Sequence, residues 1–336
     1  MNNTTKKTTY ILFSLLVSLI LNGCWTRNFY LAYKHLDPVD GHCFEDVQYK
    51  KVPCGNTSLS IYLPYSFKEE QTQSDRLYPV YVYIHGGAWM GGTRDMIRTS
   101  EIVAKANAKE LAVTKLLPSL RKEGIAVVSI SYRFIQQVSF NLIAQDIKDA
   151  FSFLKKNEVR YHLDMQKVLI HGESAGAHLA LQYGLVDHSK EGITIKAILD
   201  LFGPTDLVAL SNHKVLLEKS PVKCSAMKLV PYSVRYKNSP INSSYNSNVS
   251  IFIMHGDIDD LVPFNQSVLL MNKMEALSGK RFKNVEEKLT PDLAKETYLI
   301  KVVKNANHGF LNKEVTPYML NDLYNMMIAY AVAQLK

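Results

Sequence analysis

The chain carries the stretch VLIHGESAG at residues 168–176, and this stretch decides how the rest of the sequence is interpreted. Residues 168–171 form an apolar run typical of a buried strand, and residues 175–185 have the pattern of a helix. Between them Gly172-Glu173-Ser174-Ala175-Gly176 fits G-x-S-x-G, in which a serine stands on a sharp strand-to-helix turn and small neighbours let the chain pass close. The stretch therefore predicts an α/β protein in which Ser174 is a nucleophile.

Apolar runs and helical patterns alternate on both sides of this turn. Strands are predicted at 47–49, 58–63, 78–84, 125–131, 168–171, 195–202, 249–255 and 298–303, and helices at 101–122, 140–156, 175–185, 264–277 and 317–335. The first two strands are short and alternating, which favours an opening antiparallel hairpin. The later strands are almost wholly apolar, which predicts a mostly parallel central sheet with helices on both faces.

No change in composition is long enough to mark a domain linker, so residues 47–336 are predicted to form one catalytic domain. Residues 205–248 are its irregular part, rich in Ser, Asn, Pro and Lys. In an α/β sheet an insertion of this kind commonly lies over the carboxyl ends of the strands. We therefore predict a small cap at about 205–248.

A second glycine motif, His85-Gly86-Gly87-Ala88-Trp89, follows the strand at 78–84. Acyl transfer needs hydrogen-bond donors aimed at the oxygen on which negative charge develops. The backbone N–H groups of Gly86 and Gly87, together with that of Ala175, are the predicted donors. The alternative is a tight Gly-Gly turn with a packing tryptophan.

Acids and a histidine complete the candidate site. The stretch HGDIDDLVP at 255–263 offers Asp257, Asp259 and Asp260, although an aspartate near a helix start is often only a cap. His308 follows the strand at 298–303 and completes the chain order Ser, Asp, His. The residues alone leave the choice of acid open.

Together these motifs resemble an α/β-hydrolase of the carboxylesterase and hormone-sensitive-lipase-like group, including the BD-FAE (bifunctional feruloyl/acetyl-xylan esterase-like) branch. The matching segments are HGGAW at 85–89, SYRF at 131–134, GESAGAHLA at 172–180, GPTDL at 203–207, HGDIDDLVPFNQS at 255–267 and NHGF at 307–310. The proline-rich segment that commonly follows the Tyr-Arg pair in this family is absent after Tyr132-Arg133.

The resemblance implies Ser174 as nucleophile, Asp259 as acid and His308 as base, with a small-molecule ester as substrate and no metal or cofactor. Two other functions stay open. One is an arylformamidase-like amidase that uses the same residues, and the other is a non-catalytic binding protein on the same fold.

The N-terminus is predicted to be a targeting segment. Lys6 and Lys7 precede an apolar run at 11–21, which as a helix would rise about 16 Å and is too short to span a bilayer. It ends in Leu21-Asn22-Gly23-Cys24, which resembles a bacterial lipobox except for Asn22. We expect a signal peptide at 1–23, lipidation of Cys24 as the membrane anchor, a tether at 24–46 and export to the cell envelope. A secreted or periplasmic soluble protein is the alternative.

The composition excludes a mostly disordered chain, a collagen-like fibre and a multispanning membrane protein. The chain has 336 residues, of which 47% are hydrophobic and 21% charged, as in an ordinary globular protein. The net charge of +8 would fall to +6 if Lys6 and Lys7 were removed, so nucleic acid is not predicted as a partner. Cys43 and Cys54 could close a small loop, but their pairing stays open beside Cys224. Zinc or redox motifs of the Cys-x-x-Cys type are absent.

Overall fold

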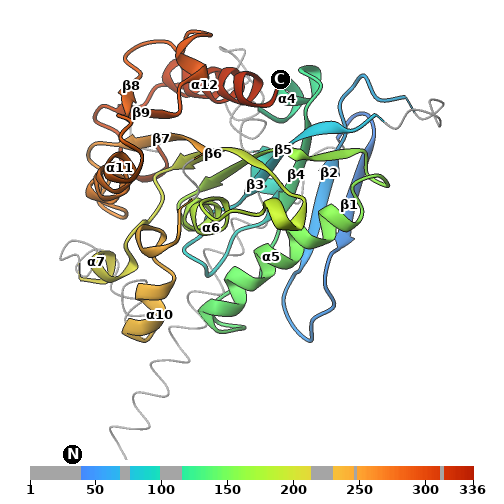
Figure 1. The fold of residues 1–336 in the computed structure, drawn as a ribbon, viewed down its shortest axis with the longest axis horizontal. Coiled ribbons are helices and arrows are strands. Elements are labelled where there is room, and N and C mark those ends of the chain that lie inside the picture. The colour runs from blue at the N-terminus through green and yellow to red at the C-terminus, as the bar shows by residue number, and fades with distance from the viewer. Residues whose placement is uncertain (1–38, 69–75, 99–115, 213–229, 246–247, 311–313) are drawn as a thin grey trace, which may run out of the picture.

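A nine-stranded sheet forms the centre of the computed structural model, which describes residues 39–68, 76–98, 116–212, 230–245, 248–310 and 314–336 (Figure 1). In chain order the strands are β1 (Cys43–Gln48), β2 (Ser58–Tyr62), β3 (Tyr78–Ile84), β4 (Ala126–Ile130), β5 (Leu163–Glu173), β6 (Ile195–Leu201), β7 (Ser250–Gly256), β8 (Lys283–Asn284) and β9 (Tyr298–Val303). Their order across the sheet is β1-β2-β4-β3-β5-β6-β7-β9-β8.

Strand direction divides the sheet into two parts. β1 pairs with β2 and β2 pairs with β4 in antiparallel fashion, as expected for an opening hairpin. Every pair from β4 through β3, β5, β6, β7 and β9 to β8 is parallel. The carboxyl ends of β3, β5, β6, β7 and β9 therefore meet at one edge, where the predicted site residues follow them.

The strands are apolar because both faces of the sheet are covered. Along β3, Val80, Val82 and Ile84 belong to one hydrophobic core, while Tyr81 and Tyr83 belong to the other. Successive side chains of a strand point to opposite faces, so a strand buried on both sides needs apolar residues at every position.

Helices form the two outer layers. One core contains side chains of α5 (Phe140–Lys156), α6 (Ala175–Gly184) and α11 (Asn265–Ser278), and the other contains those of α4 (Leu116–Lys122) and α12 (Pro317–Leu335). Figure 1 shows α5 and α6 on one side of the sheet and α4 and α12 on the other. The predicted α/β-hydrolase fold is confirmed.

Several boundaries differ from the prediction. The sheet begins at Cys43 rather than at residue 47, so β1 takes in the end of the segment predicted as a tether. β5 begins at Leu163, ahead of the predicted 168. The described part of segment 205–248 contains two short helices, α7 (Leu207–Ser211) and α10 (Tyr232–Lys237). The predicted helix at 101–122 lies outside the described residues up to 115.

The cysteines of the first strand and loop do not pair with each other. Cys43 is half-buried and Cys54 is exposed, and both are free thiols. Cys24 and Cys224 lie outside the described residues.

Candidate active site

Ser174 lies on the sharp turn between β5 and α6, in a backbone conformation that side chains rarely adopt. Its φ is 52° and its ψ is −117°, and this strain is typical of residues held for function. A Cβ on Gly176 would collide with the carbonyl oxygen of Ile84, and one on Gly172 would collide with the backbone of Gly176. Both flanking glycines are therefore required for the turn to pass beside β3.

His308 stands between Ser174 and Asp259. The Oγ of Ser174 lies 2.9 Å from Nε2 of His308, and Nδ1 of His308 lies 2.7 Å from Oδ2 of Asp259. An ionised carboxylate only accepts hydrogen bonds, so Nδ1–H donates to Asp259 and Nε2 is left to accept from the serine hydroxyl. The structure thus brings the three predicted residues, which are distant in sequence, into one hydrogen-bonded chain.

The neighbouring acids, Asp257 and Asp260, have other surroundings. Asp257 has a carboxylate oxygen 3.4 Å from Nζ of Lys304, in a largely exposed ion pair. Asp260 is half-buried on the same loop. Of the three acids that the sequence left in competition, Asp259 is the one whose carboxylate reaches His308.

Asp259 is held in its ionised form. Burial opposes its charge, but hydrogen bonds from His255 and His308 and from the backbone N–H of Val262 outweigh burial and lower the pKa of Asp259 to about 2. Its Oδ1 accepts from the N–H groups of Leu261 and Val262, at 3.0 and 2.9 Å. This carboxylate therefore carries a full negative charge toward His308 at neutral pH.

Two other carboxyl groups near the turn behave differently. Burial raises the pKa of Glu173 to about 7 and the pKa of Asp200, on β6, to about 6. Each is therefore much easier to protonate than Asp259, which makes Asp259 the acid suited to face a histidine that gains charge.

The glycine loop after β3 lies against the nucleophile turn. A Cβ on Gly86 would stand 2.9 Å from the carbonyl oxygen of Glu173 and 3.4 Å from Cβ of Ser174. Gly87 has a φ of 115°, and its carbonyl accepts hydrogen bonds from the N–H groups of Met90 and Gly91. The loop therefore brings its backbone beside Ser174, where Ala175 also begins α6.

One stacked ring pair and one hydrogen bond hold this loop against Tyr132. The buried ring of His85 stacks on Tyr132 with ring centroids 4.3 Å apart, and the Tyr132 hydroxyl donates to the His85 carbonyl at 2.8 Å. Burial lowers the pKa of His85 to about 4, so this ring is neutral and acts in packing. The SYRF segment, through Tyr132, thus packs against the glycine loop and stabilises it.

Two residues near the site were missed by the sequence analysis. Phe202, just past β6, packs its ring edge against the imidazole of His308 with centroids 4.8 Å apart. His255, which was treated only as a strand end, lies beside Asp259. The spacing of four residues between His255 and Asp259 was the signal available for the second of these.

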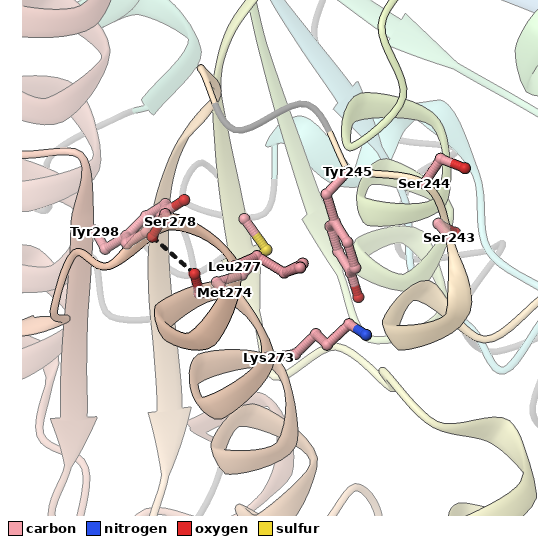
Figure 2. Close-up of a pocket in the computed structure, with 8 residues that line it drawn as sticks. All are labelled: Ser243, Ser244, Tyr245, Lys273, Met274, Leu277, Ser278 and Tyr298. Carbon is pink, nitrogen blue, oxygen red and sulfur yellow. Dashed lines mark hydrogen bonds between the residues drawn. The ribbon is translucent and has the colours of Figure 1, made fainter.

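A pocket of about 410 Å³ lies at the opposite edge of the sheet, where β7 and β9 begin (Figure 2). It is lined by Ser243, Ser244, Tyr245, Lys273, Met274, Leu277, Ser278 and Tyr298. Tyr298 opens β9, whereas His308 follows the far end of that strand. Six residues of strand separate these ends by roughly 16 Å, so this pocket is distinct from the Ser174 site.

The described residues contain neither a candidate metal cluster nor a membrane-spanning helix. Within the described ranges, no group of three or more His, Cys, Asp or Glu side chains could hold a metal ion. None of the helices described here is long and apolar enough to cross a membrane.

The mostly parallel sheet, the strained serine turn and the Ser174–His308–Asp259 arrangement define an α/β-hydrolase. The chain belongs to the BD-FAE family, whose sequence model matches residues 59–274. The resemblance inferred from the motifs is thereby confirmed.

Comparison with known proteins gives distant relatives. Isoprenylcysteine alpha-carbonyl methylesterase ICME of Arabidopsis thaliana is 26% identical over 239 residues, which cover 66% of this chain and 50% of that protein. The chain spans about half the length of the first curated relatives it matches.

Solved structures show the same fold. Esterase B from Lactobacillus rhamnosis has a TM-score of 0.65 at 16% identity, covering 95% of each chain. A truncated carbohydrate esterase from gut microbiota has a TM-score of 0.58 at 22% identity, covering 88% of this chain and 99% of that one. At 16% and 22% identity, these structural similarities show a shared fold and nothing more.

Proposed function

We propose that this protein is a serine carboxylesterase that hydrolyses small or medium carboxylic esters through an acyl-enzyme on Ser174. The observation that carries the proposal is the hydrogen-bonded chain from Ser174 through His308 to Asp259, with distances of 2.9 and 2.7 Å. Membership of the BD-FAE family and the esterase names of its relatives support the choice of an ester as substrate.

In the proposed mechanism, His308 Nε2 takes the proton of Ser174 as its oxygen attacks the ester carbonyl. The backbone N–H groups of Gly86, Gly87 and Ala175 hold the oxyanion, and Asp259 offsets the positive charge that develops on His308. His308 then gives its proton to the leaving alcohol. Water enters, loses a proton to the same nitrogen and attacks the acyl-enzyme; the bond to Ser174 breaks, His308 returns the proton to the serine oxygen, and the acid is released.

A substrate panel tests the reaction class. We expect the purified protein to cleave p-nitrophenyl esters from acetyl to decanoyl, with one acyl length preferred, and a fluorophosphonate probe to label Ser174. An N-formyl aryl amide in the same panel is expected to be cleaved much more slowly than the best ester.

Two outcomes would replace the proposal. Faster cleavage of the formyl amide would favour the arylformamidase-like alternative. A folded protein that neither cleaves esters nor takes up the probe would favour a binding protein on this fold.

We also propose that the protein is exported and anchored in the cell envelope by a lipid on Cys24. The full chain, produced in a bacterial host, is expected to incorporate radiolabelled palmitate and to sediment with membranes. Cys24→Ser should lose the label, whereas Cys43→Ser, which changes a free thiol of β1, should retain it. Equal labelling of all three proteins, or none of the wild type, would contradict the anchor.

A further inference from the structure

His255, near the end of β7, is fully buried and makes three polar contacts beside the proposed acid. Its Nε2 lies 2.8 Å from the carbonyl oxygen of Val262 and 3.4 Å from Oδ2 of Asp259. Its Nδ1 lies 2.7 Å from Oγ of Ser267. Because both partners of Nε2 only accept, Nε2 carries the proton, and Nδ1 accepts from the Ser267 hydroxyl.

These contacts close the loop that carries the acid. Asp259 Oδ1 accepts from the backbone N–H groups of Leu261 and Val262, while the carbonyl of Val262 accepts from His255. The remaining carboxylate oxygen, Oδ2, lies between His255 on one side and His308 on the other. One imidazole nitrogen therefore lies 2.8 Å from the backbone oxygen of the loop and 3.4 Å from the carboxylate oxygen that faces His308.

The surroundings of His255 favour this fixed orientation. Ser267 comes from α11, and Phe264 packs its ring at right angles to the imidazole with centroids 5.6 Å apart. The charged groups that face His255 are Asp259 and the buried Asp200 of β6. Of the interactions that lower the pKa of Asp259, the hydrogen bond from His255 is the largest.

We propose that His255 is a positioning residue for ester hydrolysis, whose Nε2–H binds the Val262 carbonyl and lies against Asp259 Oδ2, so that the carboxylate stays aimed at Nδ1 of His308. The proposal rests on the esterase function proposed above and extends it. His255 touches no reacting atom, so its effect passes through Asp259 and His308.

The expected consequence is a loss of kcat with little change in KM. Without His255, Oδ2 is held by His308 alone, and the loop carbonyl of Val262 loses its buried donor. Loss of a hydrogen bond to a charged group raises the free energy of activation by an amount that slows a reaction roughly 10- to 100-fold. We expect His255→Leu to lower kcat by about that factor and to leave KM within about twofold.

Two further variants grade the effect. His255→Gln retains an N–H close to the position of Nε2 and should retain more kcat than His255→Leu. Ser267→Ala leaves His255 in place but removes the hydrogen bond that anchors its Nδ1, and it should lower kcat roughly 3- to 10-fold.

His188 provides the matched control. It is also a buried histidine, with Nε2 2.9 Å from the carbonyl of Tyr183 and Nδ1 2.6 Å from Glu191, but it precedes the amino end of β6, whereas Asp259 follows the carboxyl end of β7. His188→Leu should lower thermal stability as His255→Leu does and leave kcat unchanged.

The orientation of the acid can be observed directly by proton NMR. The Nδ1–H of His308 that donates to Asp259 should give a far-downfield resonance in the wild type, and Asp259→Asn should abolish it. In His255→Leu the resonance should shift upfield or broaden, and in His188→Leu it should be unchanged.

Wild-type kcat and an unchanged resonance in a folded His255→Leu protein would overturn the inference. If that variant does not fold, wild-type kcat in both His255→Gln and Ser267→Ala would do so. Failure of the wild type to react with the fluorophosphonate probe would instead refute the proposed function itself.

Discussion

Ser174→Ala should abolish ester hydrolysis, lowering kcat/KM for p-nitrophenyl acetate on the order of 10⁵-fold or more. Residues that act as one unit lose nearly their whole effect when the nucleophile is removed. The substitution removes only the hydroxyl that lies 2.9 Å from His308, while Gly172 and Gly176 still allow the turn. The melting temperature should therefore stay within a few degrees of the wild type.

Ser189→Ala is a suitable control for this experiment. Ser189 is an exposed serine whose hydroxyl contacts Asp187, far from the site. It should retain full activity and full labelling by the fluorophosphonate probe. Substantial activity in a folded Ser174→Ala protein would refute the assignment of the nucleophile.

Much of the fold could be predicted from the sequence because its strands are buried on both faces. Such strands are almost wholly apolar, which marked β3 and, despite Lys301, β9 to the residue. The two-residue β8 leaves no such pattern, since both of its side chains are exposed. α10 was also missed, because a six-residue helix with no buried side chain has no apolar face to detect.

The candidate site was predictable in part, for a similar reason. Ser174 and the glycine loop occupy turns that demand particular residues, and such demands are visible in a sequence. The acid was not decided by the residues alone, because an aspartate that caps a loop and one that faces a histidine look the same. The structure shows that Asp259 does both, with Oδ1 on the loop backbone and Oδ2 toward His308.

Phe202 and His255 could not be assigned from the sequence because their contacts join elements that are distant along the chain. Phe202 contacts His308 only because β6 ends beside the turn that follows β9. The role of His255 depends on Ser267, which is supplied by the next helix. Contacts of this kind depend on the order of the strands across the sheet, and local sequence patterns do not predict that order.

Asp259→Asn should lower kcat by roughly 10⁴-fold, close to the loss expected when a catalytic histidine is held in the wrong tautomer. The two backbone N–H groups at Oδ1 will retain the amide oxygen, so the amide nitrogen must face His308 and His255. A donor there forces His308 Nδ1 to accept, and its proton moves to Nε2. His308 then cannot take the proton of Ser174.

Asp257→Asn and Asp260→Asn are the matched controls, since each makes the same chemical change on the same loop. Asp257 is half-buried and loses its ion pair with the exposed Lys304, worth at most about 1 kcal/mol, and both variants should stay within a few-fold of wild-type kcat. Because the pKa of Asp259 is about 2, the wild type should show no loss of activity from protonation of this acid between about pH 4 and pH 9. A larger loss in either control than in Asp259→Asn would move the role of the acid to that residue, since the three side chains compete for one place beside His308.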